Sequence, residues 1–320
     1  MFGYLSLNSS LLASNYCLVS YDSIQFANTS TRAAMSSIFV LVCLVTVCIN
    51  SLVIYCIYRT NQWGNQSTFL VLVAAMCSVL CSLTSDIWSA IYILMAEEIS
   101  CKMKTLIFSI SITWLYAAVY SFCLISIDRF FKVKFLQSYP DVMTPLRFRL
   151  MLLIHSCVTV LQGFLLWIGP KFRGDGGGAM LTLPINFIVV PATLVFYLVS
   201  VKILRNLKKR QRLISEETRK LTNMAAIYIV LYIVFYLPLL LYQIMLDFIS
   251  SYLSKTQIAV LSFMVLYLPS FHGNCNGIVF LVKNRSSRRF IFEKLRKLRT
   301  SFPSFKPNQV APVLSGTIQS

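Results

Sequence analysis

The stretch "TLIFSISITWLYAAVYSFCLISIDRFFKVKF", residues 105–135, decides the fold. It holds no charged side chain from Thr105 to Ile127, and four charges then follow at once: Asp128, Arg129, Lys132 and Lys134. An α-helix needs about 20 apolar residues to cross a bilayer. An unpaired charge inside the hydrocarbon costs several kcal/mol, so charges mark the end of a span or serve a function. The stretch therefore predicts a membrane-spanning helix that ends in a charged cluster.

The same pattern recurs along the chain. Of its 320 residues, 57% are hydrophobic and only 12% are charged, against about 25% charged in soluble domains. Each charge-poor run is long enough to cross a bilayer; the runs lie near 33–58, 68–96, 105–127, 150–170, 179–201, 221–246 and 256–282. We therefore predict an all-α membrane protein built as a bundle of seven transmembrane helices.

The basic residues give the orientation. With seven spans the termini lie on opposite sides, and one side carries 23 of the 29 Lys and Arg with 5 of the 11 Asp and Glu. That side accounts for the whole net charge of +18. Because Lys and Arg are enriched in cytoplasmic loops, we predict an extracellular N-terminus in the plasma membrane. No basic start followed by an apolar core appears in residues 1–30, so no cleavable signal peptide is expected.

The segments outside the spans differ in composition. We predict an extracellular segment (1–32), the seven-helix domain (33–283), an amphipathic helix on the inner leaflet (284–299) and a disordered cytoplasmic tail (300–320). The glycine-rich stretch 169–184 is expected to be a flexible outer loop.

Cysteines, sequons and basic residues say little about chemistry. Asn8 and Asn28 begin glycosylation sequons in the predicted extracellular segment. Cys17 and Cys101 alone fall on the oxidising side and are a candidate disulfide, which sequence cannot settle.

The basic residues flank spans, so anionic lipid explains them better than nucleic acid. The two histidines are far apart and no metal-ligand spacing occurs, so no metal, cofactor or enzymatic site is predicted.

Four short motifs resemble those of the rhodopsin-like (class A) G-protein-coupled receptors. Asp128-Arg129-Phe130 looks like the Asp-Arg-Tyr triplet that ends span three, and "INSLVIY" matches Gly-Asn-x-x-Val through Asn50 and Val53. "VFYLP", ending at Pro238, looks like Cys-Trp-x-Pro, and "NGIVF", residues 276–280, looks like Asn-Pro-x-x-Tyr. The order of the four motifs and a basic amphipathic helix after the last of them suit this family.

The resemblance implies a receptor that binds an extracellular ligand and activates a heterotrimeric G protein. Arg129 would carry the switch, because its planar fork can exchange one acceptor for another. Asp128 would hold it locally, and Glu216 or Glu217 would restrain it from span six. Pro238 would bend span six, with Tyr236 transmitting the motion. Asn50 and Asn276 would supply polar contacts between spans.

The chain departs from the family pattern at several positions. Gly277 stands where the family has proline, and Phe280 where it has the tyrosine of span seven. Tyr236 replaces tryptophan in span six, and Cys77 aligns with the sodium-binding aspartate of span two. The loop after span four has no cysteine, so the usual disulfide of the family is absent. These departures identify a divergent member, and the size of the chain also suits a chemosensory receptor by analogy.

The ligand is not identified by the sequence. Ser111 aligns where amine receptors carry aspartate, and Ser270 where visual pigments carry the retinal lysine, so a bioamine or retinal is disfavoured. The remaining candidate ligands are a small apolar or weakly polar compound, such as an odorant-like one, and a short peptide. The outer halves of the spans offer these candidate contacts: Asp86, Trp88, Tyr92, Ser111, Trp114, Tyr242, Gln243, Asp247 and Tyr267.

Two other functions stay open. A divergent seven-helix protein that does not couple to G proteins would also fit the departures at Tyr236, Gly277 and Phe280. A transporter is disfavoured, because the charges inside the spans are few and lie near their ends.

Overall fold

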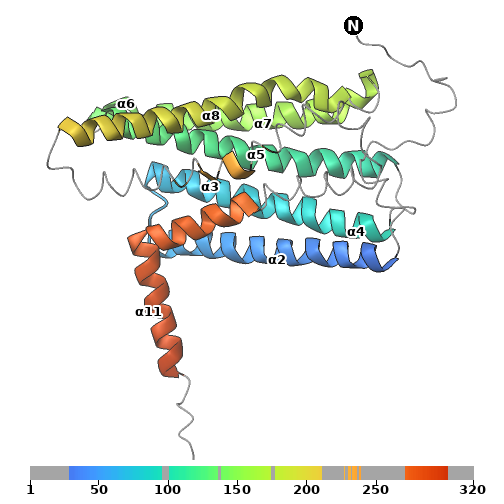
Figure 1. Ribbon diagram of the computed structural model, residues 1–320, viewed down its shortest axis with the longest axis horizontal. Helices are drawn as coiled ribbons and strands as arrows, with labels where there is room; N and C mark the ends of the chain where they lie inside the picture. The colour runs from blue at the N-terminus through green and yellow to red at the C-terminus, as the bar shows by residue number, and fades with distance from the viewer. Residues whose placement is uncertain are drawn as a thin grey trace, which may run out of the picture.

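The computed structural model describes residues 29–95, 101–135, 138–173, 177–210 and 271–301, with scattered residues between 227 and 238. These residues form helices and short turns, and no strand occurs among them. The elements, labelled in Figure 1, are α2 (Thr29–Arg59), α3 (Gln66–Cys81), the π-helical turn η2 (Ser82–Asp86), α4 (Ile87–Met95), α5 (Cys101–Phe135), α6 (Tyr139–Val142), α7 (Pro145–Arg173), α8 (Gly177–Arg210) and α11 (Arg285–Ser301).

Five helical stretches in the described residues are long and apolar enough to cross a membrane: Arg32–Arg59, Gln66–Met95, Ser109–Phe135, Pro145–Ile168 and Phe187–Asn206. They coincide with the first five predicted spans. The sixth and seventh predicted spans lie largely outside the described residues, although 271–283 is helical. The described part is thus an all-helical bundle suited to a membrane, and the count of seven stays a prediction.

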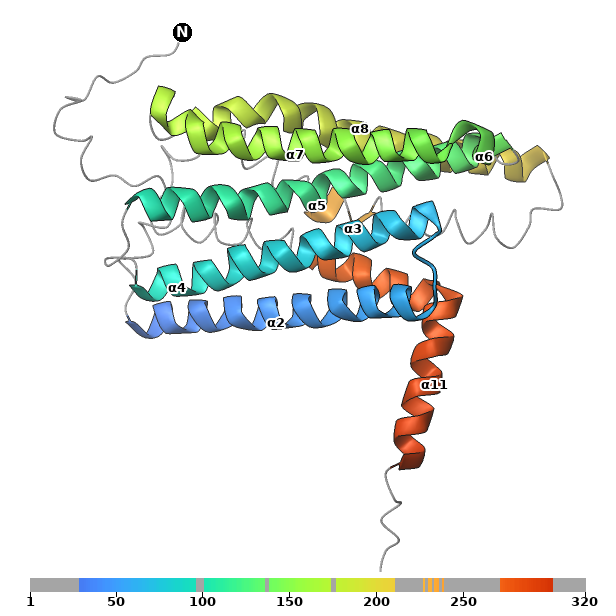
Figure 2. The same cartoon turned by 180° about the vertical axis from the view of Figure 1, so that it is seen from behind.

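Helix α5 is the centre of the bundle. It runs between α3 on one side and α7 and α8 on the other (Figures 1 and 2). In the apolar 18-residue window of its candidate span 67% of the residues are buried, against 22% for the window of α7 and 33% for that of α2. Its buried Tyr116, Val119 and Phe122 join Leu70 and Leu166 in the largest apolar cluster.

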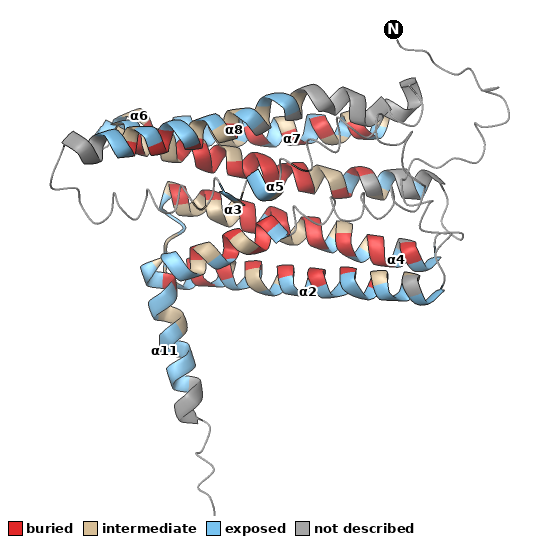
Figure 3. Cartoon of the chain, in the orientation of Figure 1, coloured by how far each residue is buried: buried red, intermediate tan, exposed pale blue. Residues whose placement is uncertain are grey.

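The outward faces of the helices are exposed (Figure 3), and many of the exposed side chains are large and apolar. Leu41 of α2, Val160 of α7 and Ile188 of α8 are all more than half exposed. Such surfaces are uncommon on soluble proteins and suit contact with lipid. Helix association in lipid depends on close contact between small side chains. Gly163 of α7 illustrates this, since a Cβ there would lie 2.4 Å from Oγ1 of Thr113 in α5.

Two local features differ from expectation. The glycine-rich stretch 169–184 was expected to be a long flexible loop, but α7 continues to Arg173 and α8 begins at Gly177. Glycine lowers helix stability by only about 0.5–1 kcal/mol relative to alanine, so a helix can still include these glycines. Helix α2 also begins inside the predicted extracellular segment, at Thr29.

Helix α11 covers the region predicted as an amphipathic helix and runs across the direction of the bundle helices (Figure 1). Asn284 precedes it, and its Oδ1 accepts a hydrogen bond from the Ser287 backbone N–H at 3.0 Å. The Asn284 amide donates to Oε1 of Gln62, in the loop after α2, at 2.8 Å. The side chains of Phe290 and Tyr55 meet with ring centroids 5.6 Å apart. These contacts tie the start of α11 to the end of α2.

Candidate functional site

The charged end of α5 lies against the first turn of α3. Asn65 caps α3, because its Oδ1 accepts hydrogen bonds from the backbone N–H groups of Ser67 and Thr68 at 3.1 and 3.4 Å. The cap sets where α3 starts and thereby brings the Ser67 side chain to α5.

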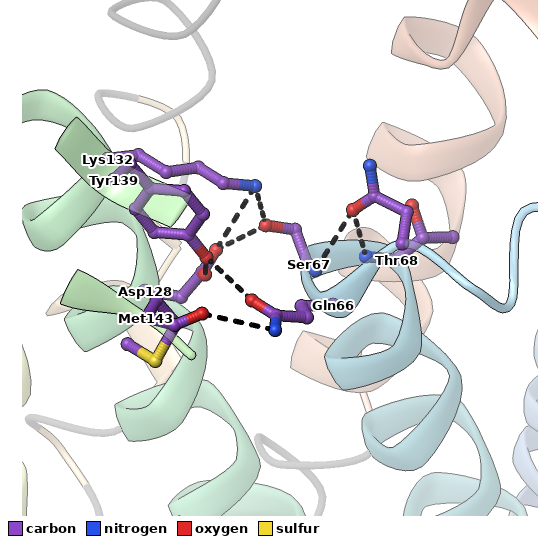
Figure 4. Close-up of polar contacts among 8 residues, drawn as sticks. Gln66, Ser67, Thr68, Asp128, Lys132, Tyr139 and Met143 are labelled. Carbon is purple, nitrogen blue, oxygen red and sulfur yellow. Dashed lines mark hydrogen bonds and ion pairs between the residues drawn. The ribbon is translucent and has the colours of Figure 1, made fainter. Parts of the chain in front are cut away.

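Asp128 is the centre of a polar cluster (Figure 4), which we call the Asp128 cluster: Gln66, Ser67, Asp128, Lys132, Tyr139 and Met143. Its carboxylate is only 1% exposed. It accepts one hydrogen bond from the Ser67 hydroxyl of α3 and another, of 2.5 Å, from the Tyr139 hydroxyl of α6. Lys132, one helical turn further along α5, places its ammonium 3.7 Å from Oδ2.

Lys132 and Tyr139 also interact with each other and with α3. The ammonium of Lys132 donates to the Ser67 hydroxyl and lies 5.0 Å from the centre of the Tyr139 ring. Burial, followed by the charge of Asp128, raises the pKa of Tyr139. The Tyr139 phenol therefore stays protonated at neutral pH and remains a hydrogen-bond donor to Asp128.

Gln66 completes the link between α3 and the short helix α6. Its amide nitrogen donates to the Met143 carbonyl at 3.3 Å, and its Oε1 lies 3.3 Å from the Tyr139 hydroxyl. The Asp128 cluster thus holds α3, α5 and α6 together at one end of the bundle.

Arg129 differs from the expected arrangement. We expected Asp128 to hold Arg129, but the structure pairs Asp128 with Lys132 instead. The helix geometry explains this, because side chains four residues apart lie on one face and adjacent ones do not. The Nε of Arg129 is buried without a hydrogen-bond partner, and no ion pair of Arg129 occurs among the described residues. Asp128 therefore has an ion-pair partner, whereas the Nε–H group of Arg129 donates no hydrogen bond to a described residue.

A second polar site lies between α2, α3, α5 and the helical residues 271–283. Asn50, Ser78 and Asn276 line a small cavity of about 20 Å³. This volume is enough for about one water molecule. Oδ1 of Asn276 is buried there without a partner. Gly277 allows this close approach, because a Cβ on it would lie 2.7 Å from Cγ2 of Ile49.

The cavity shows which side chain of α3 faces the polar site. The sequence aligned Cys77 with the sodium-binding aspartate, yet Ser78 is the side chain that faces Asn50 and Asn276. Cys77 packs against Ala117 and Ala118 of α5 instead. Among the described residues that line the cavity there is no carboxylate.

The described ligand candidates lie near η2. Asp86 is 3% exposed and accepts a hydrogen bond from Ser82 within this π-helical turn. Ser111 of α5 donates to the Thr84 carbonyl at 2.9 Å. The structure therefore brings Asp86 and Ser111 to the same turn. Trp88 and Trp114 are partly buried.

Several predicted residues lie outside the described part of the chain or have undescribed side chains. They include the restraints and the rest of the ligand candidates: Asn8, Cys17, Asn28, Tyr92, Cys101, Glu216, Glu217, Tyr236, Tyr242, Gln243, Asp247 and Tyr267. Pro238 is described as helical and partly buried, and Phe280 is buried against Val53 and Ala75. No group of His, Cys, Asp and Glu within the described ranges is arranged to hold a metal.

Sequence reasoning missed Ser67, Tyr139 and His272. Lys132 could have been found from its spacing of four residues from Asp128. Ser67 and Tyr139 come from other elements, and no local pattern indicates that they meet Asp128. A scan against models of known protein families and a search of curated proteins both find no match, so the functional assignment of this chain depends on its own residues.

Proposed function

We propose that this chain is a seven-helix receptor, similar to the rhodopsin-like family, which binds an extracellular ligand and activates a heterotrimeric G protein. The observation that carries the proposal is the contrast between Asp128 and Arg129. Three side chains from α3, α5 and α6 engage Asp128, whereas the buried Nε of Arg129 has no partner.

This contrast suits a switch. A guanidinium is always charged and presents several donors in a fixed fork, so it can exchange an internal acceptor for one on a partner protein. The Asp128 cluster would keep α3, α5 and α6 fixed while Arg129 changes partner. Outward movement of span six would open a groove for a helix of the G protein. Glu216 and Glu217 are the acids we propose to restrain Arg129 in the resting state.

Side chains near the Asp128 cluster suit the cytoplasmic face. Tyr58 and Trp63, at the end of α2 and in the following loop, are 72% and 57% exposed. Such aromatic side chains are enriched at membrane interfaces. The exposed Arg288 and Arg289 of α11 would contact anionic lipid of the inner leaflet. This placement is consistent with an extracellular N-terminus at the plasma membrane.

The proposal predicts that removing the span-six acids activates the receptor. Glu216→Gln/Glu217→Gln is expected to raise basal guanine-nucleotide exchange on the order of tenfold, because a lost restraint of 1–3 kcal/mol shifts the equilibrium by about that factor. We would measure exchange with a panel of Gα proteins in cells, at matched surface levels, without any ligand.

Glu293→Gln is the matched control, because Glu293 lies on α11 and is exposed. It should leave basal exchange at the wild-type level. Absence of exchange in every variant at normal surface level would favour a seven-helix protein that does not couple to G proteins.

A further inference from the structure

His272 is a buried histidine at the meeting point of three predicted spans. It is 1% exposed and lies in the helical residues 271–283. Its ring meets Phe122 of α5 edge to face, with centroids 4.4 Å apart and planes at 85°. It also meets Phe235, in the sixth predicted span, at 5.9 Å and 61°. One imidazole therefore contacts spans three and six from span seven.

The imidazole also has a polar contact within span seven. The amide nitrogen of Asn276 lies 3.1 Å from its ring nitrogens and donates to it. Only a neutral imidazole has a nitrogen that can accept this hydrogen bond, since both nitrogens of the protonated ring are donors. Asn276 in turn lines the cavity shared with Asn50 and Ser78. His272 thus connects the aromatic contacts to the polar cavity.

The partners of His272 occupy positions that a moving span six would affect. Phe122 precedes Asp128 by six residues on the same helix, which is about 9 Å along its axis. Phe235 is the second residue of the motif "VFYLP" that ends at Pro238, the predicted bend of span six. A shift of span six at this bend would change the contact between Phe235 and His272. The His272 ring would then change position, and so would the hydrogen bond that it accepts from the Asn276 amide.

We propose that His272 is a positioning residue that couples the sixth span to Asn276 and the cavity. In the resting arrangement the neutral ring holds Phe235 and orients the Asn276 amide. Outward movement of span six releases both contacts together. This inference rests on the proposed receptor function, which gives the movement its purpose, but the contacts can be tested without it.

The test compares the two histidines of the chain. His155 of α7 is also buried, but its Nε2 lies 3.1 Å from the Ala117 carbonyl and 3.2 Å from the Ser121 hydroxyl, both on α5. We would measure amide hydrogen exchange of the purified full-length protein, wild type, His272→Leu and His155→Leu, with peptides that cover 227–238 and 271–283.

His272→Leu is expected to raise amide hydrogen exchange about fivefold in both 227–238 and 271–283. The first segment loses an aromatic contact and the second a hydrogen bond, and each is worth about 1 kcal/mol. His272→Phe keeps the ring and loses the acceptor. It should therefore restore protection in 227–238 but leave 271–283 exposed to exchange. His155→Leu should raise exchange only in α5 and α7.

The inference is overturned if His272→Leu leaves 227–238 unchanged, or if His155→Leu raises exchange there equally. Basal guanine-nucleotide exchange, measured on the same variants, separates this inference from the receptor proposal. A purely structural role predicts equal basal exchange in the two leucine variants, whereas coupling predicts a rise in His272→Leu alone. The expected hydrogen-exchange pattern without G-protein activation in any variant would support the contacts that His272 makes with span six and Asn276 and contradict the receptor proposal.

Discussion

Asp128→Ala is expected to lower the free energy of unfolding by about 3 kcal/mol, since removing one partner of a buried ion pair leaves the other charge uncompensated. Lys132, only 23% exposed, would lose its counter-ion. The hydroxyls of Ser67 and Tyr139 would lose a charged acceptor. Hydrogen bonds to charged groups contribute about 1.5–3 kcal/mol each, so the loss exceeds that of an ordinary surface change. The measurement is the thermal unfolding midpoint of the purified protein in detergent.

Asp141→Ala provides the control for this change. Asp141 is an acid in the first turn of the same short helix α6, but it is exposed. Its replacement should cost less than about 1 kcal/mol, the usual effect of a charge at a helix start. Equal unfolding midpoints for the two variants would contradict the contacts assigned to Asp128.

Gly163→Ala is expected to destabilise the contact between α5 and α7 by about 1–3 kcal/mol, the usual cost of inserting a methylene into a packed interior. The added Cβ would lie 2.4 Å from Oγ1 and 3.0 Å from Cγ2 of Thr113, so one helix must shift. The same thermal unfolding assay measures the effect.

Two further variants identify the cause. Thr113→Ala removes the two nearest atoms that the new Cβ would meet and leaves only the Cβ of residue 113, at 3.3 Å, so the double variant Gly163→Ala/Thr113→Ala should recover most of the lost stability. Gly64→Ala adds a Cβ where nothing lies within 4 Å and should leave the midpoint unchanged. A double variant no more stable than Gly163→Ala alone would argue against this contact.

The first five spans could be predicted because hydropathy is a property of each segment alone. The charge-free run 33–58 and the observed apolar helix Arg32–Arg59 differ by one residue at each end. The π-helical turn η2 could not be predicted in this way. It depends on how Asp86 and Ser111 are accommodated between neighbouring helices, which is decided by tertiary contacts.

The candidate site was predicted in part. Asp128, Asn50 and Asn276 were expected to be polar positions of the bundle, and the structure places all three in buried polar sites. Which partners they meet depends on helix rotation, and a shift of one residue turns a side chain by about 100°. For that reason Ser78 rather than Cys77 faces the cavity, and Lys132 rather than Arg129 pairs with Asp128.

The central claim is that Arg129 acts on a G protein once its surroundings are released. The most direct test measures guanine-nucleotide exchange with Glu216→Gln/Glu217→Gln and with the same double variant carrying Arg129→Ala, at matched surface levels in cells. The account predicts that loss of the two acids raises exchange on the order of tenfold and that the added Arg129→Ala returns it to the level of cells without the receptor. Raised exchange that persists without Arg129, or no exchange with either variant, would contradict it.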